Sequence, residues 1–450
     1  MLMIIFFSTA EILSCGGDFL ISLWEENSDL PSFDTLEGEA DTDVLIVGGG
    51  ISGILCAYKL RELGIDYILV EADKICRKTT AKTTAKITSQ HGLIYSRLIR
   101  EFNRDYAKAY YEANEQALKD YRKLFQNIDC DYKETETCVY SRHDKGKITE
   151  ELDALKSLGI ESNFVVNTEL PFEIAGGVKF FGQATFNPLK FIATIAKGLN
   201  IYENTRVLKI TKNAAYTEKG RVRAKKIIIT THFPFIDKHG FYFLKMFQER
   251  SYVILLEGAK EIRGAYAPED SSGLSFRGYG DLLLLGGSNH RTGKSGCGWE
   301  YLYEAAKKYY PDASVKKEWA TQDCISLDGV PYIGKYSLLS EDLYVATGFN
   351  KWGMSSSMVA ATLLCDLITG KKNKYEKIFT PKRSILRKQL AANTLEAVSG
   401  WLSFGKKRCP HLGCGLTYNK YEHTWDCPCH GSRFDGDGNL IDNPANTGIK

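Results

Sequence analysis

The sequence lacks several features that would point to a particular partner or compartment. Its formal net charge is only +3 over 450 residues, and the small excess is spread along the chain, so it gives no reason to expect a nucleic acid as a partner. No apolar run approaches the roughly 18 residues that a membrane-spanning helix needs, which predicts a protein without an integral membrane segment. The sequence also shows no internal repeat and no low-complexity tract. Its composition, 44% apolar and 25% charged, is that of an ordinary globular protein.

The N-terminus is the one candidate for a targeting signal. Its apolar run, MLMIIFF, covers only seven residues, no lysine or arginine precedes it, and Glu11 interrupts the continuation. Cys15 suggests a lipoprotein cleavage site, but a disordered or mis-started leader fits these features better. We therefore expect a cytoplasmic protein whose residues 1–40 form a leader and an approach segment.

Cysteine is not scarce, and its distribution is uneven. Eight of the twelve cysteines are scattered singly, which is typical of buried or free thiols rather than of a disulfide scaffold. The other four fall within 21 residues near the end of the chain: Cys409, Cys414, Cys427 and Cys429. This cluster needs a specific chemical explanation.

The chain is too long for a single core of usual size, so two or three domains are expected. Near the start, DVLIVGGG, ISGILCAYKLREL and DYILVEA predict a strand, a helix and a second strand within about 30 residues. The pattern from Leu93 to about Ile128 predicts one long amphipathic helix, and residues 160–300 alternate β-rich runs with turns. Later, LYVATG predicts a buried strand that leads into a helix.

The glycines of the first unit indicate a dinucleotide site. Gly48, Gly50 and Gly53 match the pattern G-x-G-x-x-G between a strand and a helix. The first glycine permits the tight turn, the second lets the backbone approach a pyrophosphate, and the third allows the helix to pack closely on the strand. Glu71 ends the second strand, where a carboxylate can bind the ribose hydroxyls of an adenosine.

These residues suit NAD and FAD equally, and two distant segments favour FAD. IIITTH (227–232) and LYVATGFNKWGMSSS (343–357) are typical of later strands that close over an FAD. In the second segment, the turn from Gly348 to Ser357 places a helix N-terminus where a flavin ring edge could lie. Donors at that position would stabilise negative charge on a reduced flavin. An ordinary strand–turn–helix remains the alternative interpretation of this segment.

With these motifs in place, residues of about 41–385 resemble the D-amino-acid-oxidase/glycine-oxidase superfamily of FAD-dependent oxidoreductases. The resemblance is carried by VLIVGGGISG…ILVEA, TTAKTTAKITSQHG, SLDGVPYIG and LYVATGFNKWGM. It implies FAD as cofactor, with flavin contacts at Gly48, Gly50, Gly53, Glu71, Thr83, Thr84, Gly348 and Gly353. One departure follows Glu71, where relatives often carry glycines and this chain has Lys78 and Ala81.

The cysteine cluster is interleaved with histidines in a pattern that suits iron. C-P-H-x2-C followed by C-P-C-H-G-S gives two cysteines and two histidines, the ligands of a Rieske-type [2Fe–2S] centre: Cys409, His411, Cys427 and His430. A tetrahedral zinc site with the same four ligands is the alternative. Zinc leaves unexplained the additional cysteine in each loop and the HGSRFD that follows.

The stretch resembles the Rieske proteins of respiratory and photosynthetic chains, and this resemblance implies a disulfide between Cys414 and Cys429. Nearly the whole chain resembles a bacterial family of FAD-dependent oxidoreductases fused to a C-terminal Rieske domain. The expected fold is therefore α/β, with a Rossmann-like FAD-binding domain interleaved with a mixed α+β substrate domain over 41–385. A linker at 386–408 and a small all-β Rieske domain at 409–450 follow.

The combination of cofactors predicts a dehydrogenase that acts on CH–NH donors. The superfamily implies oxidation of an amine or amino acid, with electrons passing from FAD to the [2Fe–2S] cluster and then to an external acceptor. A redox sensor or electron carrier without substrate turnover is one alternative, and an O2-using oxidase with a zinc site is another. A Rieske-type oxygenase would need a further iron site with two histidines and a carboxylate, and no such cluster is visible among eight histidines.

Three residues are candidates for the catalytic site. In GGSNHRTG, Arg291 could pair bidentately with a substrate carboxylate and His290 lies beside it, although Arg291 suits a structural ion pair or a flavin contact equally well. His91, in SQHG, could face the flavin or be a structural histidine. Tyr252 and Trp352 are candidate walls of the site, and aromatic residues at such positions are more often part of a core.

Overall fold

The computed structural model describes residues 21–236, 240–270, 272–403 and 405–449. Residues 1–20 of the expected leader, with Cys15, lie outside this part of the chain. The first described element is the short helix α1 (Leu23–Glu26), which begins at a capping box formed by Ser22 and Glu25.

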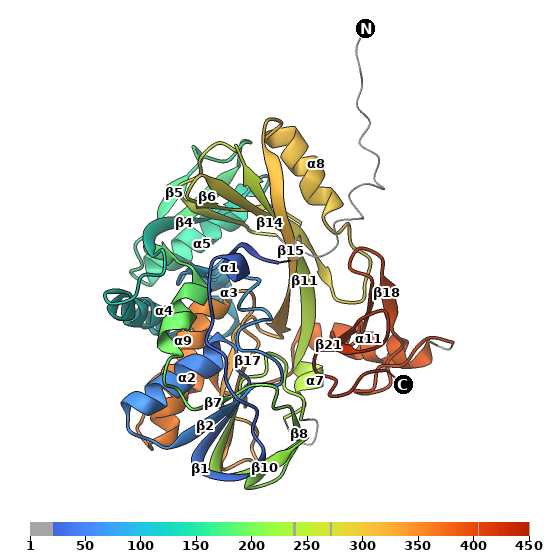
Figure 1. The fold of residues 1–450 in the computed structure, drawn as a ribbon. Coiled ribbons are helices and arrows are strands. Elements are labelled where there is room, and N and C mark those ends of the chain that lie inside the picture. The colour runs from blue at the N-terminus through green and yellow to red at the C-terminus, as the bar shows by residue number, and fades with distance from the viewer. Residues whose placement is uncertain (1–20, 237–239, 271, 404, 450) are drawn as a thin grey trace.

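The first sheet contains the expected strand–helix–strand unit. Strand β1 (Gly38–Val47) lies between β10 (Gly220–Ile229) and β2 (Tyr67–Val70) and is parallel to both. Among the described residues, the strand order is β16-β17-β10-β1-β2-β7, and β8 and β9 extend the sheet from β10. The other strands are β7 (Ile201–Tyr202), β8 (Val207–Ile210), β9 (Ala214–Thr217), β16 (Tyr332–Lys335) and β17 (Leu343–Thr347). Helices α2 (Ile51–Glu62) and α9 (Gly353–Ile368) pack against each other over this sheet (Figure 1).

The second sheet is mixed and forms the upper layer in Figure 1. Its order in the described chain is β15-β11-β14-β13-β12-β4-β6-β3, and β5 pairs with β6. The strands are β3 (Lys86–Ile87), β4 (Lys133–Ser141), β5 (Asn163–Val165), β6 (Gly176–Thr185), β11 (Met246–Glu257), β12 (Ala265–Pro268), β13 (Ser275–Tyr279), β14 (Leu282–Arg291) and β15 (Ser314–Ser326). Because the chain crosses between the two sheets several times, the two layers are interleaved, as the sequence predicts.

The remaining helices differ in one place from the expectation. The predicted long helix is divided into α3 (Ile94–Glu101) and α4 (Arg104–Phe125). The division occurs because the Asn103 side chain accepts a hydrogen bond from the Tyr106 amide at 2.8 Å, which starts a new helix. The remaining helices are α5 (Lys145–Ser157), α6 (Pro188–Ile195), α7 (Tyr242–Lys245), α8 (Glu300–Tyr309) and α10 (Glu376–Phe379).

The end of the chain forms a small separate layer, which we call the C-terminal unit (residues 405–449). Helix α11 (Lys388–Leu402) precedes it, within the segment expected as a linker. Its four-stranded antiparallel sheet consists of β18 (Thr417–Asn419), β19 (Thr424–Asp426), β20 (Arg433–Phe434) and β21 (Leu440–Asp442). This all-β unit lies beside the lower ends of β11 and β15 (Figure 1).

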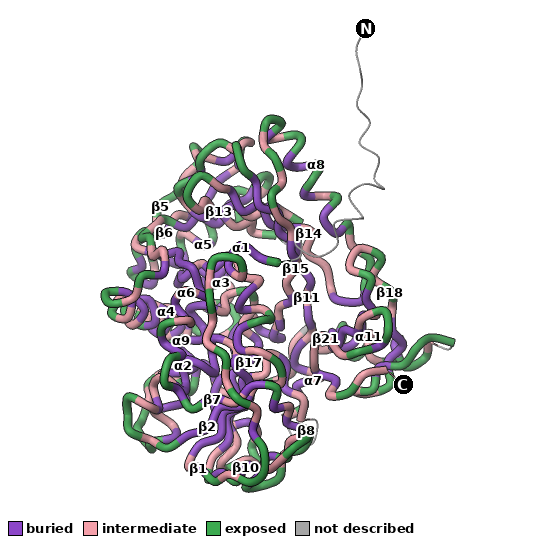
Figure 2. Tube along the Cα trace, viewed as in Figure 1, coloured by how far each residue is buried: buried purple, intermediate pink, exposed green. Residues whose placement is uncertain are grey.

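Buried residues run continuously through the two large layers, and the C-terminal unit has its own small core (Figure 2). That core consists of Cys409, Cys414, Leu416, Cys427, Cys429, Phe434 and Ala445. Four of these seven side chains are cysteines, so the unit has little apolar surface to bury by itself. Its stability must come largely from its sulfur chemistry and from its contacts with the rest of the protein.

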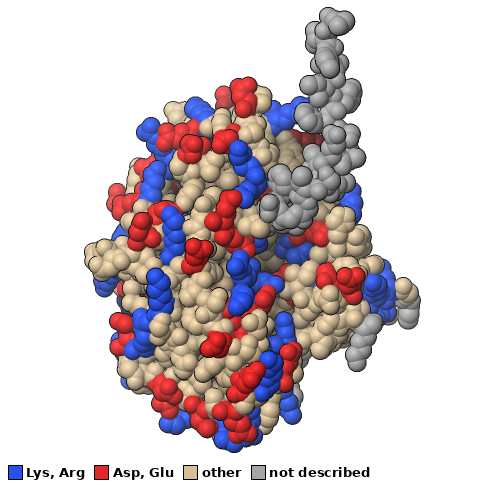
Figure 3. Space-filling view, viewed as in Figure 1, with Lys and Arg blue, Asp and Glu red and all other residues tan. Residues whose placement is uncertain are grey.

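Two further observations concern the surface and the membrane. No helix in the described ranges combines the length and apolar character needed to cross a bilayer. In Figure 3, acidic and basic side chains are interspersed over the visible face, and neither sign forms a large continuous area.

Candidate functional site

A large cavity of about 540 Å³ lies where the two sheets meet. It begins at the glycine turn after β1 and reaches the second sheet at Ser251–Val253 and Thr321–Asp323. This volume is within the range of protein sites for small molecules. Its length, from one sheet to the other, suits an extended dinucleotide with a reactive ring at the second sheet.

The glycine turn has the close approaches that the G-x-G-x-x-G pattern predicts. Gly48 has φ +112°, and an added Cβ would lie 2.7 Å from the carbonyl oxygen of Thr230. A Cβ on Gly53 would lie 2.0 Å from the carbonyl oxygen of Gly48, so this glycine serves the packing of α2 on β1 and does not line the cavity. Gly50 lines the cavity and precedes the first residue of α2, so the N-terminus of this helix lies at the cavity.

Glu71 lies directly after β2 and lines the same end of the cavity. Its carboxylate accepts hydrogen bonds from the amides of Gly49, at 2.6 Å, and Asp73, at 3.0 Å. Burial nevertheless raises the pKa of this carboxyl above its usual value. These two bonds fix the carboxylate beside the glycine turn, where it can accept a hydrogen bond from a hydroxyl of a bound ligand.

The other predicted flavin contacts also line the cavity. They are Thr83, Thr84, Gly348 and Gly353. Helix α9 begins at Gly353 with no side chain capping its first turn, so its amides are open to the cavity. Negative charge on a ligand is favoured at such a helix start.

Unsatisfied polar atoms in the cavity wall support a polar cofactor. Four buried side-chain atoms of lining residues have no hydrogen-bond partner among the described residues: Ser52 Oγ, His232 Nε2, Thr321 Oγ1 and Ser357 Oγ. Buried polar groups are rarely left in this state unless a ligand or water completes them. Together with the glycine turn and Glu71, these atoms fit FAD as the molecule that fills the cavity.

The four predicted cluster ligands lie on two facing loops of the C-terminal unit. The thiols of Cys409 and Cys427 are buried and hydrogen-bonded to each other, which lowers the pKa of Cys409 to about 6. The rings of His411 and His430 are 5.0 Å apart and nearly perpendicular. The Nδ1 atom of His430 is buried and has no hydrogen-bond partner in the described structure, so a lone pair is available for a metal.

The two loops have matching backbone geometry. The amide of Cys409 donates to the carbonyl of Cys414, and the amide of Cys427 donates to the carbonyl of Ser432, both at 2.9 Å. The amide of Gly413 donates to the carbonyl of Cys409, and the amide of Gly431 donates to the carbonyl of Cys427, both at 2.9 Å. Each loop therefore presents one cysteine and one histidine from a rigid turn.

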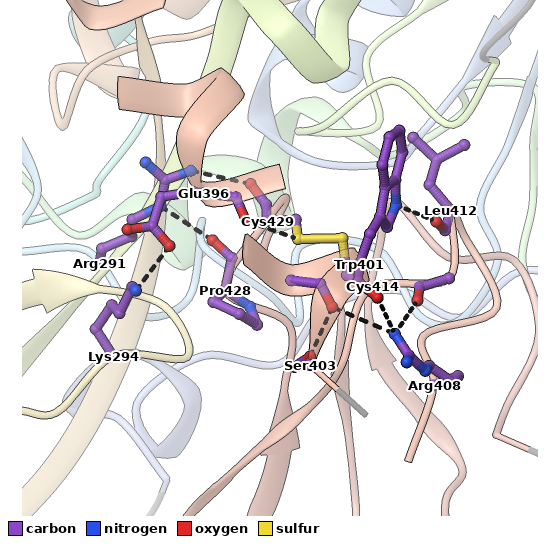
Figure 4. Close-up of a disulfide and its surroundings, with 12 residues drawn as sticks. Arg291, Lys294, Glu396, Trp401, Ser403, Arg408, Leu412, Cys414, Pro428 and Cys429 are labelled. Carbon is purple, nitrogen blue, oxygen red and sulfur yellow. Dashed lines mark hydrogen bonds and ion pairs between the residues drawn. A yellow bond between two sulfur atoms is a disulfide. The ribbon is translucent and has the colours of Figure 1, made fainter. Parts of the chain in front are cut away.

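A disulfide joins Cys414 to Cys429 and thereby connects the two loops (Figure 4). Among the described residues, the only three potential metal ligands whose ligand atoms all lie within 4.8 Å of one another are Cys414, Cys427 and Cys429, and the disulfide removes two of these as ligands. The ligand atoms of the four predicted ligands are spread more widely than this. Around a single tetrahedral zinc they would have to lie close together. Ligands divided between two irons can be spread more widely, so the arrangement fits a [2Fe–2S] cluster better.

The three catalytic candidates are not brought together at the cavity, and none of them lines it. Arg291 lies at the end of β14, and its guanidinium donates to the carbonyls of Pro428, at 3.0 Å, and Cys429, at 3.1 Å. It therefore supports the second cluster loop (Figure 4). The contact of Arg291 with a substrate carboxylate stays a prediction, and this position favours the structural alternative, because the guanidinium is bonded to the loop and does not line the cavity.

The two histidine candidates are also behind the cavity wall. His91 lies 2.6 Å from the Tyr110 hydroxyl and donates from Nε2 to the Thr88 carbonyl at 2.8 Å, and burial lowers its pKa to about 3. It stacks on Trp352 at 5.0 Å, and His290 stacks on Tyr252 at 5.7 Å. The aromatic residues Trp352 and Tyr252 line the cavity themselves.

The cavity also contains charged residues that were not among the site residues predicted from the sequence. Four of its five lysines form ion pairs with carboxylates, namely Lys74, Lys78, Lys82 and Lys351. Lys86, on β3, has no such ion pair with any described residue, and burial together with Arg277 lowers its pKa to about 8. The only sequence signal for Lys86 was its place in TTAKTTAKITSQHG, where several residues were equally good candidates.

Known protein families match both parts of the chain, the one that forms the cavity and the one that carries the predicted cluster ligands. The family described as FAD dependent oxidoreductase matches residues 43–367, and the Rieske [2Fe-2S] domain family matches residues 376–450. The "Putative Rieske 2Fe-2S iron-sulfur protein YhfW" of Bacillus subtilis is 35% identical, and the alignment covers 94% of this chain and 95% of that protein. A cytochrome b6-f complex iron-sulfur subunit of Trichormus variabilis is 45% identical over 42 residues, which are 9% of this chain and 24% of that protein.

Solved structures show the same fold at low sequence identity. L-proline dehydrogenase from P. horikoshii has a TM-score of 0.65 at 17% identity and covers 77% of this chain and 98% of its own. Glycine oxidase from Geobacillus kaustophilus has a TM-score of 0.64 at 17% identity and covers 77% of this chain and 99% of its own. At this level of identity the likeness concerns the fold.

Proposed function

This chain belongs to the FAD dependent oxidoreductase family and carries a Rieske [2Fe-2S] domain, and we propose that it is a dehydrogenase that oxidises an amine or an amino acid and delivers the electrons to an external acceptor. Bound FAD accepts two electrons from a substrate C–H bond as hydride, whereas a [2Fe–2S] cluster with histidine ligands, at about −150 to +300 mV, carries one electron at a time. In this proposal the C-terminal unit is the exit for electrons that enter at the cavity.

The observation that carries the proposal is the direct contact between the cavity wall and the second cluster loop. Gln322 lines the cavity, and its Nε2 donates to the carbonyl of Gly431 at 2.9 Å and to Gln248 Oε1 at 2.8 Å. Gln248 Nε2 donates to the carbonyl of His430 at 2.7 Å. Two hydrogen-bonded glutamines are thus all that separates the cavity from the backbone of a predicted cluster ligand.

The contact is also tightly packed. Gly431 has φ +84°, and an added Cβ would lie 2.6 Å from the Cβ of Gln248. Only glycine allows the loop to approach β11 so closely at this backbone conformation. A short and well-packed connection favours electron transfer between two groups held on its two sides.

Buried charges hold the C-terminal unit in one orientation. Glu422 accepts hydrogen bonds from Arg250 of β11, from Tyr252 and from Arg433. Burial opposes ionisation of Glu422, but Arg250 and Arg433 together lower the pKa of its carboxyl to about 2. A buried and bidentate arginine–carboxylate pair of this type specifies geometry more than it adds stability.

The substrate class is inferred from the family and from the cavity. The structural neighbours named as glycine oxidase and L-proline dehydrogenase are named for amino acids. In the cavity of this chain, Tyr252 and Trp352 offer an apolar wall, and Lys86 offers a cation that could receive a carboxylate. This assigns to Lys86 the role that the sequence suggested for Arg291.

An anaerobic optical and EPR titration tests the proposal. Purified holoprotein is mixed with individual amines and amino acids in the absence of O2, with dithionite as the positive control. We expect at least one such substrate to bleach the flavin and to produce the EPR signal of a reduced [2Fe–2S] cluster in the same sample. Bleaching by dithionite with no response to any amine or amino acid would favour a redox sensor or electron carrier. Flavin bleaching without a cluster signal would favour an oxidase whose C-terminal site holds zinc.

A further inference from the structure

The C-terminal unit supplies part of the wall of the flavin cavity. Five lining residues come from strand β21 and the loop after it: Leu440, Ile441, Asp442, Asn443 and Asn446. In Figure 1, β21 lies on the side of the C-terminal unit that faces β11 and α7. The cavity is therefore completed by a segment that follows the last predicted cluster ligand by ten residues or more.

Asn443 attaches this segment to the layer of the first sheet, which we call the FAD-binding layer. Its Nδ2 donates to the carbonyl of Thr231 at 2.5 Å and to the carbonyl of Phe233 at 2.7 Å. Thr231 and His232 line the cavity directly after β10. On its other side, the carbonyl of Asn443 accepts from Gln248 Nε2 at 3.1 Å.

The same segment is attached to both cluster loops through one buried serine. The amide of Ala445 donates to Ser432 Oγ at 3.0 Å. The Ser432 hydroxyl is also hydrogen-bonded to the thiol of Cys409. The backbone carbonyl of Ser432 accepts a hydrogen bond from the amide of Cys427 at 2.9 Å. Ser432 is fully buried. The position of the cavity wall and the position of two predicted cluster ligands thus depend on the same few hydrogen bonds.

We propose that residues 440–446 are part of the FAD site and that FAD and the iron–sulfur cluster each strengthen the binding of the other. The cluster orders the two loops, Ser432 transmits that order to residues 443–446, and these residues complete the wall of the cavity. A metal site that depends on folding contributes its binding free energy to the order of its surroundings. Because coupling between two binding sites is reciprocal, bound FAD must in turn strengthen the binding of the cluster by the same factor.

The first experiment compares FAD binding with and without the cluster. FAD is removed from the holoprotein under mild conditions, half of the sample is also freed of iron with a chelator, and both halves are titrated with FAD by flavin fluorescence. We expect the Kd for FAD to be on the order of tenfold higher in the cluster-free sample. In the reverse direction, bound FAD should raise the chelator concentration at which half of the cluster is lost at equilibrium. Equal Kd values with intact secondary structure in both samples would overturn the proposal.

The second experiment tests the attachment residue. Asn443→Ala removes both hydrogen bonds to the FAD-binding layer, and we expect it to raise the Kd for FAD several-fold while the cluster EPR signal keeps its full intensity. Asn439→Ala is the matched control, because Asn439 is exposed and its side chain bonds only to Asp435 in its own turn. An Asn443→Ala protein that binds FAD as tightly as the control would show that residues 440–446 are not part of the flavin site. Neither experiment measures turnover, so both outcomes are independent of the proposed dehydrogenase activity.

Discussion

Arg291 donates a hydrogen bond of 3.1 Å from Nη2 to the carbonyl oxygen of Cys429, one half of the disulfide between the two cluster loops. Its Nε bonds to the neighbouring Pro428 carbonyl, and Nη1 bonds to Asn393 Oδ1 in α11 at 3.0 Å. The guanidinium therefore joins the end of β14, the second cluster loop and α11. An arginine used in this way positions the cluster loop, and its side chain does not line the cavity.

The first prediction follows from this position. Arg291→Met should leave two partly buried carbonyls of the cluster loop without donors, at a cost of up to about 1–3 kcal/mol for each group. We expect the cluster to bleach at a lower urea concentration or temperature, followed by its visible absorbance. The affinity of the flavin site for carboxylate ligands should stay within about twofold of the wild-type value.

The control for this variant is Arg263→Met, which removes an arginine whose side chain is 76% exposed and paired only with Glu261. It should change neither property. A large loss of carboxylate binding in Arg291→Met, with an unchanged cluster, would instead return Arg291 to the substrate role.

The second prediction concerns Lys86 as the cation that receives a substrate carboxylate. Lys86→Met should weaken the binding of a carboxylate ligand by about 10- to 100-fold, the usual value of one charge-assisted hydrogen bond. It should leave the binding of an uncharged amide of the same size nearly unchanged. Both affinities can be measured from the perturbation of the flavin absorption spectrum. Lys74→Met is the control, because Lys74 also lines the cavity but is paired with Glu203 at 2.7 Å.

The same lysine predicts a pH dependence. The pKa of Lys86 is lowered to about 8, mainly by burial, so the side chain is cationic below that pH and neutral above it. Carboxylate affinity in the wild-type protein should therefore be constant near pH 7 and fall as the pH rises through 8 and above. In Lys86→Met this fall should disappear, and an identical pH profile in both proteins would contradict the assignment.

The sequence was sufficient to predict those parts of both sites whose residues lie close together in the chain. The glycine turn, Glu71 and the start of α9 each follow a buried strand, so their place at one edge of the sheet is dictated by local pattern. The cluster loops are similarly local, because four ligands fall within 22 residues of a recognisable spacing. Their positions could be predicted without knowledge of the packing.

The contacts between the layers could not be predicted in this way. Arg291 bonds to a residue 137 positions later, and Asn443 bonds to one 212 positions earlier. The local sequence identifies neither of these contacts, and only the docking of the C-terminal unit brings the two residues to their partners. A similar limit applies to the long predicted helix, because a single side-chain cap at Asn103 overrode its continuous apolar periodicity.

The third prediction uses the buried pair of Glu422 with Arg250 and Arg433. The pKa of Glu422 is about 2 in the folded protein, against an ordinary value of 4.5. A carboxyl with a lowered pKa stabilises the fold above its unfolded pKa and loses this contribution as the pH falls toward the folded value. We therefore expect the C-terminal unit of the wild-type protein to lose about 3 kcal/mol of stability between pH 5 and pH 2 from this residue.

Glu422→Gln should lose a similar amount of stability already at pH 7, since it leaves the buried Arg250 without its carboxylate and removes one of the three carboxylates around Arg433. The difference between variant and wild type should shrink as the pH falls, because the wild-type carboxyl then becomes neutral as well. Denaturant unfolding curves at several pH values, followed by cluster absorbance, measure this. Glu261→Gln, at an exposed carboxylate, is the control, and a pH-independent difference for Glu422→Gln would argue against the ion pair as the cause.

The fourth prediction concerns the disulfide, because the core of the C-terminal unit consists largely of cysteines. Cys414 and Cys429 are 15 residues apart in the sequence, and closing a loop of this length is expected to stabilise the folded state by about 3 kcal/mol. In Cys414→Ser/Cys429→Ser the two loops are joined only by hydrogen bonds, so the cluster should be lost in milder denaturant, while the flavin domain unfolds as in the wild type. Cys297→Ser, which removes an exposed free thiol, is the control and should change neither transition. If the double variant kept its cluster as firmly as this control, the hydrogen bonds of Arg291 and Ser432 alone would be sufficient to hold the two loops together.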